Sequence, residues 1–189
     1  MISIPILKRI LTEQRDHFRG EKGSIPRSQL KDIQKYLASP FVIVVSGLRR
    51  AGKSTFLAQI AHRYYPGEDY FYAHFEDDRL LGFSMDDFEK LLVTQLELFG
   101  EKKCFFLDEI QNVKGWEVFV RRLVGQGYKV YLTGSNASLL SKDLGTRLTG
   151  RYLPIELYPF SFEECLRYRG LSSNDFMQVL NSHLEAKLK

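Results

Sequence analysis

The sequence predicts a three-layer α/β fold in which a five-stranded parallel sheet lies between two layers of helices. Short apolar runs alternate along the chain with longer segments whose apolar residues recur at the helical period. This alternation is typical of parallel sheets that are covered on both faces. A glycine-punctuated basic loop, residues 47–54, also joins one apolar run to one helical segment, as expected for a fold of this class.

The composition is that of an ordinary globular protein. Of the 189 residues 44% are hydrophobic and 26% are charged, which suits one domain with room for an appendage. Cys104 and Cys165 do not make a disulfide framework, and we expect reduced thiols in a cytoplasmic protein. No apolar run approaches the length of a membrane span, so no membrane partner is expected. The net charge of +4 permits a nucleic acid partner without requiring one.

Residues 1–40 are expected to form an N-terminal helical segment. Residues 4–18 place apolar side chains at helical spacing, with charged residues between them. Pro26 is expected to open a second helix, because proline is favoured in the first turn. Ser39 and Pro40 then end that helix before the first strand.

Residues 41–158 are expected to be the core domain. Its predicted strands are residues 41–45, 70–75, 103–107, 129–133 and 151–157. Helical periodicity fills the intervals between the first four of them. Pro154 predicts an edge position for the last strand, because proline has no N–H group to donate to a neighbour. Residues 159–189 are expected to form C-terminal helices that begin a further domain, and Ser161 and Glu164 cap the first of them.

Residues 47–54, GLRRAGKS, match the pattern G-x-x-x-x-G-K-[ST] between a strand and a helix, which is the pattern of a P-loop. The backbone N–H groups of such a loop cradle phosphates, and the helix dipole adds positive potential. We expect Lys53 to reach the β- and γ-phosphates and the Ser54 hydroxyl to ligate Mg²⁺. ATP and Mg²⁺ are therefore the expected cofactors. The loop residues expected to bind the nucleotide are Gly47, Leu48, Arg49, Arg50, Ala51, Gly52, Lys53, Ser54 and Thr55.

Asp108 and Glu109 directly follow the apolar run 103–107. An apolar strand that ends in aspartate matches a Walker B strand, whose aspartate holds Mg²⁺ through water. A glutamate in the next position is placed to polarise the water that attacks the γ-phosphate. Because a P-loop is also present, we assign Asp108 to the metal and Glu109 to catalysis.

Two further polar features are candidates for the site. Ser135 or Asn136, just past the strand 129–133, could sense the γ-phosphate or the attacking water, although a plain Gly-Ser-Asn turn is an equal alternative. Arg147 and Arg151 lie in the loop before the last strand. An arginine there could stabilise the charge of the transferred phosphate, within its own subunit or across an oligomer interface, and Arg151 is the preferred candidate.

Four stretches together resemble one family. They are GLRRAGKST at 47–55, FFLDEIQNVKGWEVFVRRL at 105–123, LTGSNASLL at 132–140 and LTGRYLPIELYPFSFEE at 148–164. The family comprises the AAA+-like, ASCE-type P-loop ATPases of archaea and bacteria that carry an arginine pair in the P-loop and an Asp-Glu-Ile-Gln Walker B. The resemblance covers roughly residues 25–170, and its motifs are specific as a set.

The resemblance implies the sheet order 5-1-4-3-2 and a catalytic role for Glu109. The residues it implies for handling Mg-ATP are Lys53, Ser54 and Asp108. Arg151 matches the position of an arginine-finger-like residue in the family. Family chains usually continue into winged-helix-like and nuclease-like regions. We therefore expect a chain that stops at Lys189 to be either a fragment or a reduced member of the family, in both cases the ATPase core of a larger machine.

The leading hypothesis is the hydrolysis of Mg-ATP to ADP and phosphate. A nucleotide-gated binding module with little turnover is one alternative, and a small P-loop kinase is another. A kinase would need an acceptor pocket and an arginine-rich lid, and the Asp-Glu pair followed by a Ser-Asn turn fits a hydrolase better. ATP and ADP are the expected partners, while a nucleic acid, a protein partner and a homo-oligomer are left open.

Overall fold

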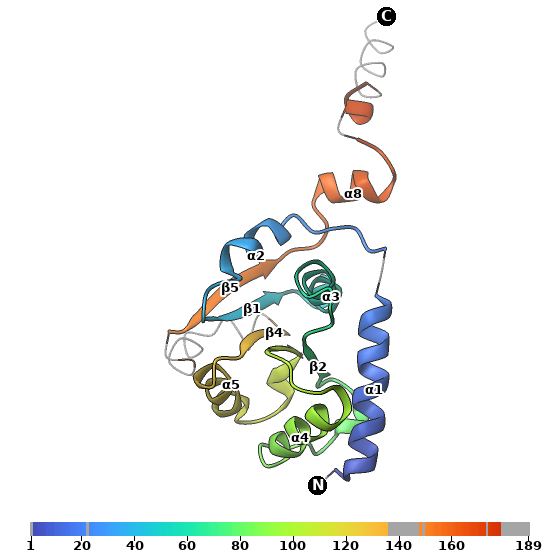
Figure 1. Ribbon diagram of the computed structural model, residues 1–189. Helices are drawn as coiled ribbons and strands as arrows, with labels where there is room; N and C mark the ends of the chain where they lie inside the picture. Colours follow the sequence, from blue (N-terminus) through green and yellow to red (C-terminus); the bar gives the residue numbers. More distant parts are fainter. Residues whose placement is uncertain (1, 22, 136–147, 149, 173, 179–189) are drawn as a thin grey trace, which may run out of the picture.

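The computed structural model describes residues 2–21, 23–135, 148, 150–172 and 174–178 (Figure 1). One sheet of five parallel strands has the order β2-β3-β4-β1-β5. The strands are β1 Val42–Gly47, β2 Phe71–His74, β3 Cys104–Asp108, β4 Lys129–Ser135 and β5 Tyr152–Leu157. Read from the β5 edge this order is 5-1-4-3-2, so the predicted fold class and strand order are confirmed.

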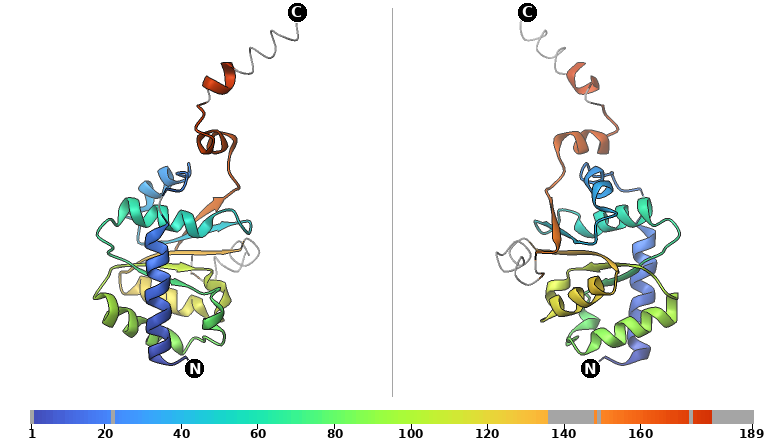
Figure 2. Two further views of the ribbon diagram at one scale, coloured as in Figure 1. Left: turned by 90° about the vertical axis from the view of Figure 1, so that its right-hand side faces the viewer. Right: turned by 60° about the vertical axis from the view of Figure 1, so that its left-hand side comes forward.

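The described helices follow the sequence periodicity closely. They include α1 Ile4–Gly20, α2 Leu30–Tyr36, α3 Lys53–Tyr64, α4 Asp87–Phe99, α5 Trp116–Gly125 and α8 Phe162–Tyr168, with short 3₁₀ turns η1 Asp78–Leu80 and η2 Ile110–Asn112. Helices α2 and α3 cover one face of the sheet, α4 and α5 cover the other, and α1 lies beside β2 (Figure 1). Helix α8 lies outside this layered core (Figure 2).

Strand β1 explains why the central strands appear as continuous apolar runs in the sequence. Val42 and Val44 belong to the apolar cluster under α4 and α5. Ile43 and Val45 belong to the other cluster, under α2 and α3. Because successive side chains point to opposite faces, a strand covered on both faces must be apolar at every position.

Helix α1 closes the exposed edge of the sheet at β2. The Gln14 amide nitrogen donates to the His74 carbonyl oxygen at 3.0 Å, and the His74 N–H donates to Gln14 Oε1 at 3.0 Å. On α4, Gln95 Nε2 donates to the Tyr72 carbonyl oxygen at 2.9 Å. These amides replace a neighbouring strand, so the edge does not offer free backbone groups for pairing with another chain at these positions.

The other edge carries β5, where Pro154 pairs with Val44 of β1. The predicted edge position of the proline is confirmed. The expectation that Pro26 opens a helix is wrong, because α2 begins at Leu30. Residues 24–27 instead run as an open segment along α3, where Gln59 donates to the Ile25 carbonyl oxygen and accepts from the Arg27 N–H group.

Candidate nucleotide-binding site

The P-loop leaves the carboxyl end of β1 and enters α3 at Lys53. Gly52, the residue before the helix, has a φ of 86°, and Arg50 has a φ of 66°. Glycine adopts such left-handed backbone without strain, and its use at residue 52 lets the chain turn directly into the helix. The loop is closed by a hydrogen bond of 3.2 Å from the Ala51 N–H to the Leu48 carbonyl oxygen.

Gly47 is required by the neighbouring strand. A Cβ atom built on Gly47 would lie 2.2 Å from the carbonyl oxygen of Leu157 in β5. The absence of a side chain here therefore lets β5 approach the end of β1.

Lys53 points into the site from the first turn of α3. Its side chain is 5% exposed, and its Nζ lies 3.2 Å from Glu109 Oε1. The same nitrogen lies 3.4 Å from the Leu48 carbonyl oxygen. The structure therefore brings the P-loop lysine and the expected catalytic glutamate into direct contact.

Asp108 is fully buried at the end of β3. One of its carboxylate oxygens, Oδ2, accepts from the Tyr72 hydroxyl at 3.0 Å and lies 3.2 Å from His74 Nδ1. The other, Oδ1, accepts from the Thr133 hydroxyl. Burial opposes ionisation, but hydrogen bonds from His74, Thr133 and Ser54 outweigh it and hold the pKa of Asp108 below its usual range.

These groups fit a hard cation such as Mg²⁺. The ionised Asp108 carboxylate, at the end of β3, lies next to the Ser54 hydroxyl in the first turn of α3. Oxygen ligands of this kind are those that Mg²⁺ prefers. Asp108 also influences His74: burial disfavours the charged imidazole, yet the adjacent carboxylate outweighs it and the pKa of His74 is raised. Among the described residues no cluster of three or more His, Cys, Asp and Glu side chains could hold a separate metal ion.

Glu109 has a left-handed backbone conformation with a φ of 52°. Its N–H group donates to Thr133 Oγ1 at 2.9 Å, and its Oε2 accepts from Gln111 Nε2 at 2.6 Å. Thr133 thus joins the two acidic residues, since its hydroxyl also donates to Asp108. This bridge holds Glu109 in a conformation that is uncommon for a residue with a side chain.

Thr133, Tyr72, His74 and Gln111 also contact the acidic pair, and no motif in the sequence indicates these contacts. Thr133 lies in the stretch that drew attention to Ser135 and Asn136. Leu107 of β3 pairs with Leu132 of β4, so the next position along β4 faces Asp108. With the strand order known, that register would have indicated Thr133, whereas residue type alone favoured the more polar turn.

Arg27 connects the P-loop to two segments distant from it in the sequence. Arg27 is 4% exposed, and its guanidinium donates to the Ala51 carbonyl oxygen at 2.8 Å and to the Tyr158 carbonyl oxygen at 2.5 Å. Its Nε donates to Glu164 Oε1 at 3.2 Å. Glu164 also accepts from the Ser161 N–H at 2.8 Å, which completes the predicted capping box of α8.

A cavity of about 350 Å³ lies beside this network and the P-loop. Its lining residues are Ser24, Ile25, Arg27, Arg50, Ala51, Gly52, Thr55, Gln59, Pro159 and Phe160. The cavity therefore borders the P-loop on one side and the segments before α2 and after β5 on the others.

A model of the AAA domain family matches residues 39–166 of the sequence. The chain belongs to this AAA domain family. It is 39% identical over 142 residues to an uncharacterized protein of Methanocaldococcus jannaschii, a match that covers 75% of this chain and 32% of that protein. It is 36% identical over 159 residues to an uncharacterized protein of Haemophilus influenzae, a match that covers 80% of this chain and 40% of that protein. The chain thus spans well under half the length of these two relatives.

A crystal structure of a DNA replication initiation factor is similar to the AAA domain over 76% of this chain and 50% of that chain. The sequence identity is 14% and the TM-score is 0.49. Among the described residues no helix is long and apolar enough to cross a membrane.

Three further P-loop residues of the AAA domain, Leu48, Arg49 and Arg50, are exposed, whereas Ala51 is buried. The Arg49 side chain is 83% exposed and pairs with Glu76, after β2, at 3.1 Å. Arg50 and Leu48 are exposed, and Arg50 lines the cavity beside the loop. Ser135 ends β4 and pairs with Gly47 in the sheet, so its backbone lies next to the P-loop. Asn136 and Arg147 lie outside the described residues.

Arg151 lies at the amino ends of the strands, whereas the P-loop lies at their carboxyl ends. Its carbonyl oxygen accepts from the N–H of Val42, the first residue of β1, whereas the P-loop follows the last residue of that strand. A strand of this length spans about 16 Å at roughly 3.3 Å per residue. The structure therefore does not bring Arg151 to the site within one chain. In a parallel sheet, a loop that leads into a strand lies at the amino ends of the strands, and the P-loop lies at the carboxyl ends.

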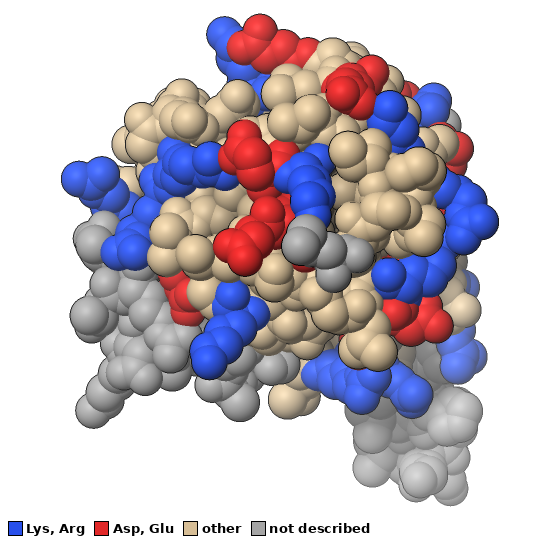
Figure 3. All heavy atoms as spheres, turned by 90° about the horizontal axis from the view of Figure 1, so that it is seen from below, with Lys and Arg blue, Asp and Glu red and all other residues tan. Residues whose placement is uncertain are grey.

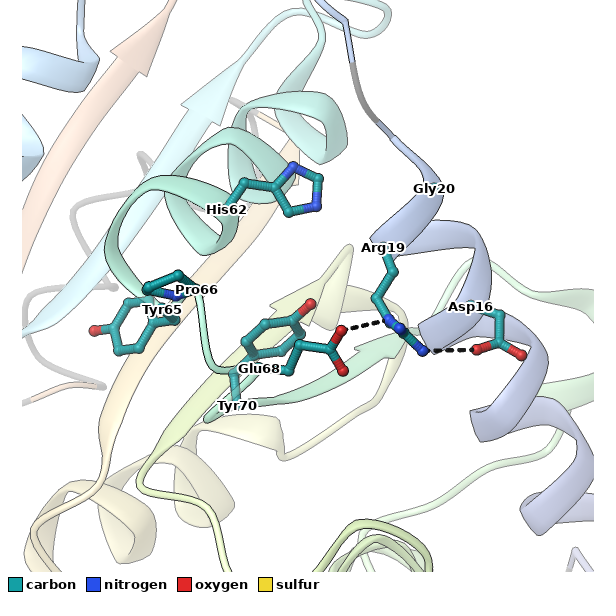
Figure 4. A pocket seen from close by; sticks show the side chains of 8 residues that line it. All are labelled: Asp16, Arg19, Gly20, His62, Tyr65, Pro66, Glu68 and Tyr70. Carbon is teal, nitrogen blue, oxygen red and sulfur yellow. Dashed lines mark ion pairs between the residues drawn. The ribbon is translucent and has the colours of Figure 1, made fainter.

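A second cavity, of about 510 Å³, lies at the other end of α3 (Figure 4). Arg19 there pairs with Glu68 at 2.7 Å and lies 3.6 Å from Asp16, and these residues line the cavity with Tyr70 and His62. Each acidic group is already paired with an arginine. None of the residues expected to bind the nucleotide lines this cavity.

On the face of the molecule seen from below in Figure 1, acidic and basic side chains are interspersed (Figure 3). Surface ion pairs join α1 to α4 through Lys8 and Glu97 at 2.8 Å, and α5 to α4 through Arg122 and Glu89 at 2.7 Å. The described part of that face therefore has no broad area of one charge sign.

Proposed function

We propose that this AAA domain binds ATP with Mg²⁺ and hydrolyses the ATP to ADP and phosphate. The observation that carries the proposal is the convergence of Lys53, Asp108 and Glu109. The Lys53 ammonium group touches the Glu109 carboxylate, and Asp108 is ionised and buried next to Ser54. These are the groups that phosphoryl transfer to water requires, namely a phosphate-binding cation, a metal-binding carboxylate and a proton acceptor.

In this proposal the phosphates lie on the P-loop, residues 47–55, with Lys53 at the β- and γ-phosphates. Ser54 and Asp108 would hold Mg²⁺, which would supply positive charge next to the triphosphate. Glu109 accepts a proton from the attacking water. The cavity of about 350 Å³ beside the P-loop has a size that suits a nucleoside, and we assign the base and sugar to it.

Ser135 and Asn136 remain proposed contacts to the γ-phosphate or to the water. Arg151 lies away from the P-loop of its own chain. We therefore propose that it acts on the site of a neighbouring copy in an oligomer. We further propose residues 1–40 as a helical segment, residues 41–158 as the catalytic core, and residues 159–189 as the start of a further domain in a larger protein. A nucleic acid or protein partner for that larger protein is part of the proposal.

A binding module with little turnover is the second candidate, because the Lys53 ammonium group and the Glu109 carboxylate form an ion pair with each other. Phosphate release measured against protein concentration, with and without DNA, separates the two functions. Turnover that rises with concentration indicates an oligomer-dependent ATPase. ATP binding without phosphate release under all these conditions supports the binding module.

Glu109→Gln provides the matched comparison. The variant should bind Mg-ATP at least as tightly as the unsubstituted chain, because a neutral amide no longer competes for Lys53, and it should stop releasing phosphate. Calorimetry and a phosphate-release assay measure the two effects. Turnover of the variant at the unsubstituted rate would remove Glu109 from the mechanism.

A further inference from the structure

Gln111 lies in the turn η2, shortly after Glu109, and its amide has two different environments. Nε2 donates to Glu109 Oε2 at 2.6 Å. This contact fixes the orientation of the amide, because a flipped amide would place its oxygen against a negatively charged oxygen. Oε1 is therefore the amide atom that does not contact Glu109 Oε2; it is buried and has no hydrogen-bond donor within the described part of the chain.

A buried acceptor without a donor is costly, so buried polar atoms in native proteins almost always have a partner. The nearby Asp108 carboxylate accepts from the Tyr72 and Thr133 hydroxyl groups. Gln111 Oε1, unlike the Asp108 carboxylate, has no donor among the described residues. The position of the Gln111 amide indicates which donor suits it. The amide lies one hydrogen bond from Glu109, and Glu109 lies 3.2 Å from Lys53.

We propose that Gln111 is a further catalytic residue, whose Oε1 accepts a hydrogen bond from the attacking water. The inference rests on the proposed hydrolysis of ATP. A γ-phosphate would draw Lys53 away from Glu109 Oε1, and that oxygen would then be free to face the same water. The water is thereby oriented by two acceptors, one on each of two neighbouring side chains.

In the reaction, the water oxygen forms a bond to the γ-phosphorus, and the bond from the γ-phosphorus to the bridging oxygen breaks. The electron pair of that bond leaves with ADP. One proton of the water passes to the Glu109 carboxylate, while the other hydrogen stays on the attacking oxygen, directed at Gln111 Oε1. Orientation of this kind lowers the barrier because the nucleophile is held near its line of attack.

The test uses Gln111→Met, which keeps the length of the side chain but removes both hydrogen-bonding ends, and Gln111→Ala. The control is Asn112→Ala, an exposed residue of the same turn. For each chain we would measure the affinity for ATP, kcat, thermal unfolding and the affinity for ADP with aluminium fluoride, which imitates the transferred phosphate with its attacking water.

Both Gln111 variants should lose kcat by about tenfold to a hundredfold, with ATP affinity within about twofold and unchanged thermal unfolding. Affinity for ADP with aluminium fluoride should fall with kcat, because the lost interaction exists only in the transition state. Asn112→Ala should match the unsubstituted chain in every measurement.

An unchanged or raised kcat in Gln111→Met would overturn the inference, since it would mean that the amide only restrains Glu109. A parallel loss of ATP affinity and thermal stability would also overturn it, in favour of a structural role. If the unsubstituted chain neither turns over ATP nor binds ADP with aluminium fluoride, the proposed hydrolysis itself fails. Turnover that is indifferent to Gln111 overturns the inference alone.

Discussion

The Lys53 ammonium group lies 3.2 Å from the Glu109 carboxylate, with both side chains largely buried. This ion pair joins the first turn of α3 to the end of β3. The two groups to which we assign phosphate binding and proton transfer are therefore in contact, and a γ-phosphate would compete with Glu109 for the ammonium group. In the proposed mechanism, binding of the triphosphate would therefore release the Glu109 carboxylate from Lys53.

Lys53→Ala should weaken Mg-ATP binding by about a hundredfold or more, because a charge-assisted contact to two phosphates is lost. Calorimetry with Mg-ATP measures the change. Lys8→Ala is the matched control, since the Lys8 ammonium group pairs with Glu97 on the surface. Equal affinities for the two variants would remove the P-loop lysine from the site.

Thr133→Val should lower kcat by about tenfold to a hundredfold and the free energy of unfolding by about 1–3 kcal/mol. Valine keeps the shape of threonine but cannot donate to Asp108 or accept from the Glu109 N–H group. Thr133→Ser keeps the hydroxyl and should retain most of the activity. Phosphate release and denaturant unfolding measure the two effects, and equal behaviour of the valine and serine variants would contradict the bridge.

Gly47→Ala should destabilise the fold by about 1–3 kcal/mol, because the new methyl group would lie 2.2 Å from the Leu157 carbonyl oxygen. Strand β5 must then move away from β1. Gly125→Ala, at the end of α5, is the control because nothing lies within 4 Å of its added Cβ. Thermal unfolding compares them, and a stable Gly47→Ala protein would show that the strands can separate without loss.

Stability at acidic pH should depend on Glu164. Burial opposes its ionised form, but the Ser161 and Ser28 N–H groups and the Arg27 guanidinium outweigh burial and lower the pKa from 4.5 to about 2. A carboxyl group whose pKa is lowered by folding stabilises the protein above its ordinary pKa. That contribution is lost as the pH falls from about 4.5 towards 2.

Glu164→Gln should therefore reduce the free energy of unfolding by about 3 kcal/mol at neutral pH. The difference from the unsubstituted chain should shrink as the pH falls through this range, because protonated Glu164 is as neutral as glutamine. Glu163→Gln, an exposed neighbour, is the control. A difference that stays constant with pH would show that the Glu164 charge does not stabilise the fold.

Part of the candidate site could be predicted because its parts are local in sequence. A P-loop needs only a strand, a glycine-containing turn and a helix in succession, and the acidic pair needs only the end of an apolar strand. The Arg27 contact with Glu164 joins residues 137 positions apart, and no periodicity indicates it. Gln111 is visible in the sequence, but the different surroundings of its amide nitrogen and oxygen depend on the tertiary structure.

The sequence by itself determined the parallel sheet, the edge position of Pro154, the P-loop and the candidate acids, because hydrophobic period and turn chemistry act over a few residues. Only the tertiary structure decided which side chains meet. It placed Thr133 between Asp108 and Glu109, and it put Arg151 at the amino ends of the strands, away from the P-loop. The physical reason is strand direction and register. They determine which loops meet at the same end of the strands, and they arise from the packing of the whole chain.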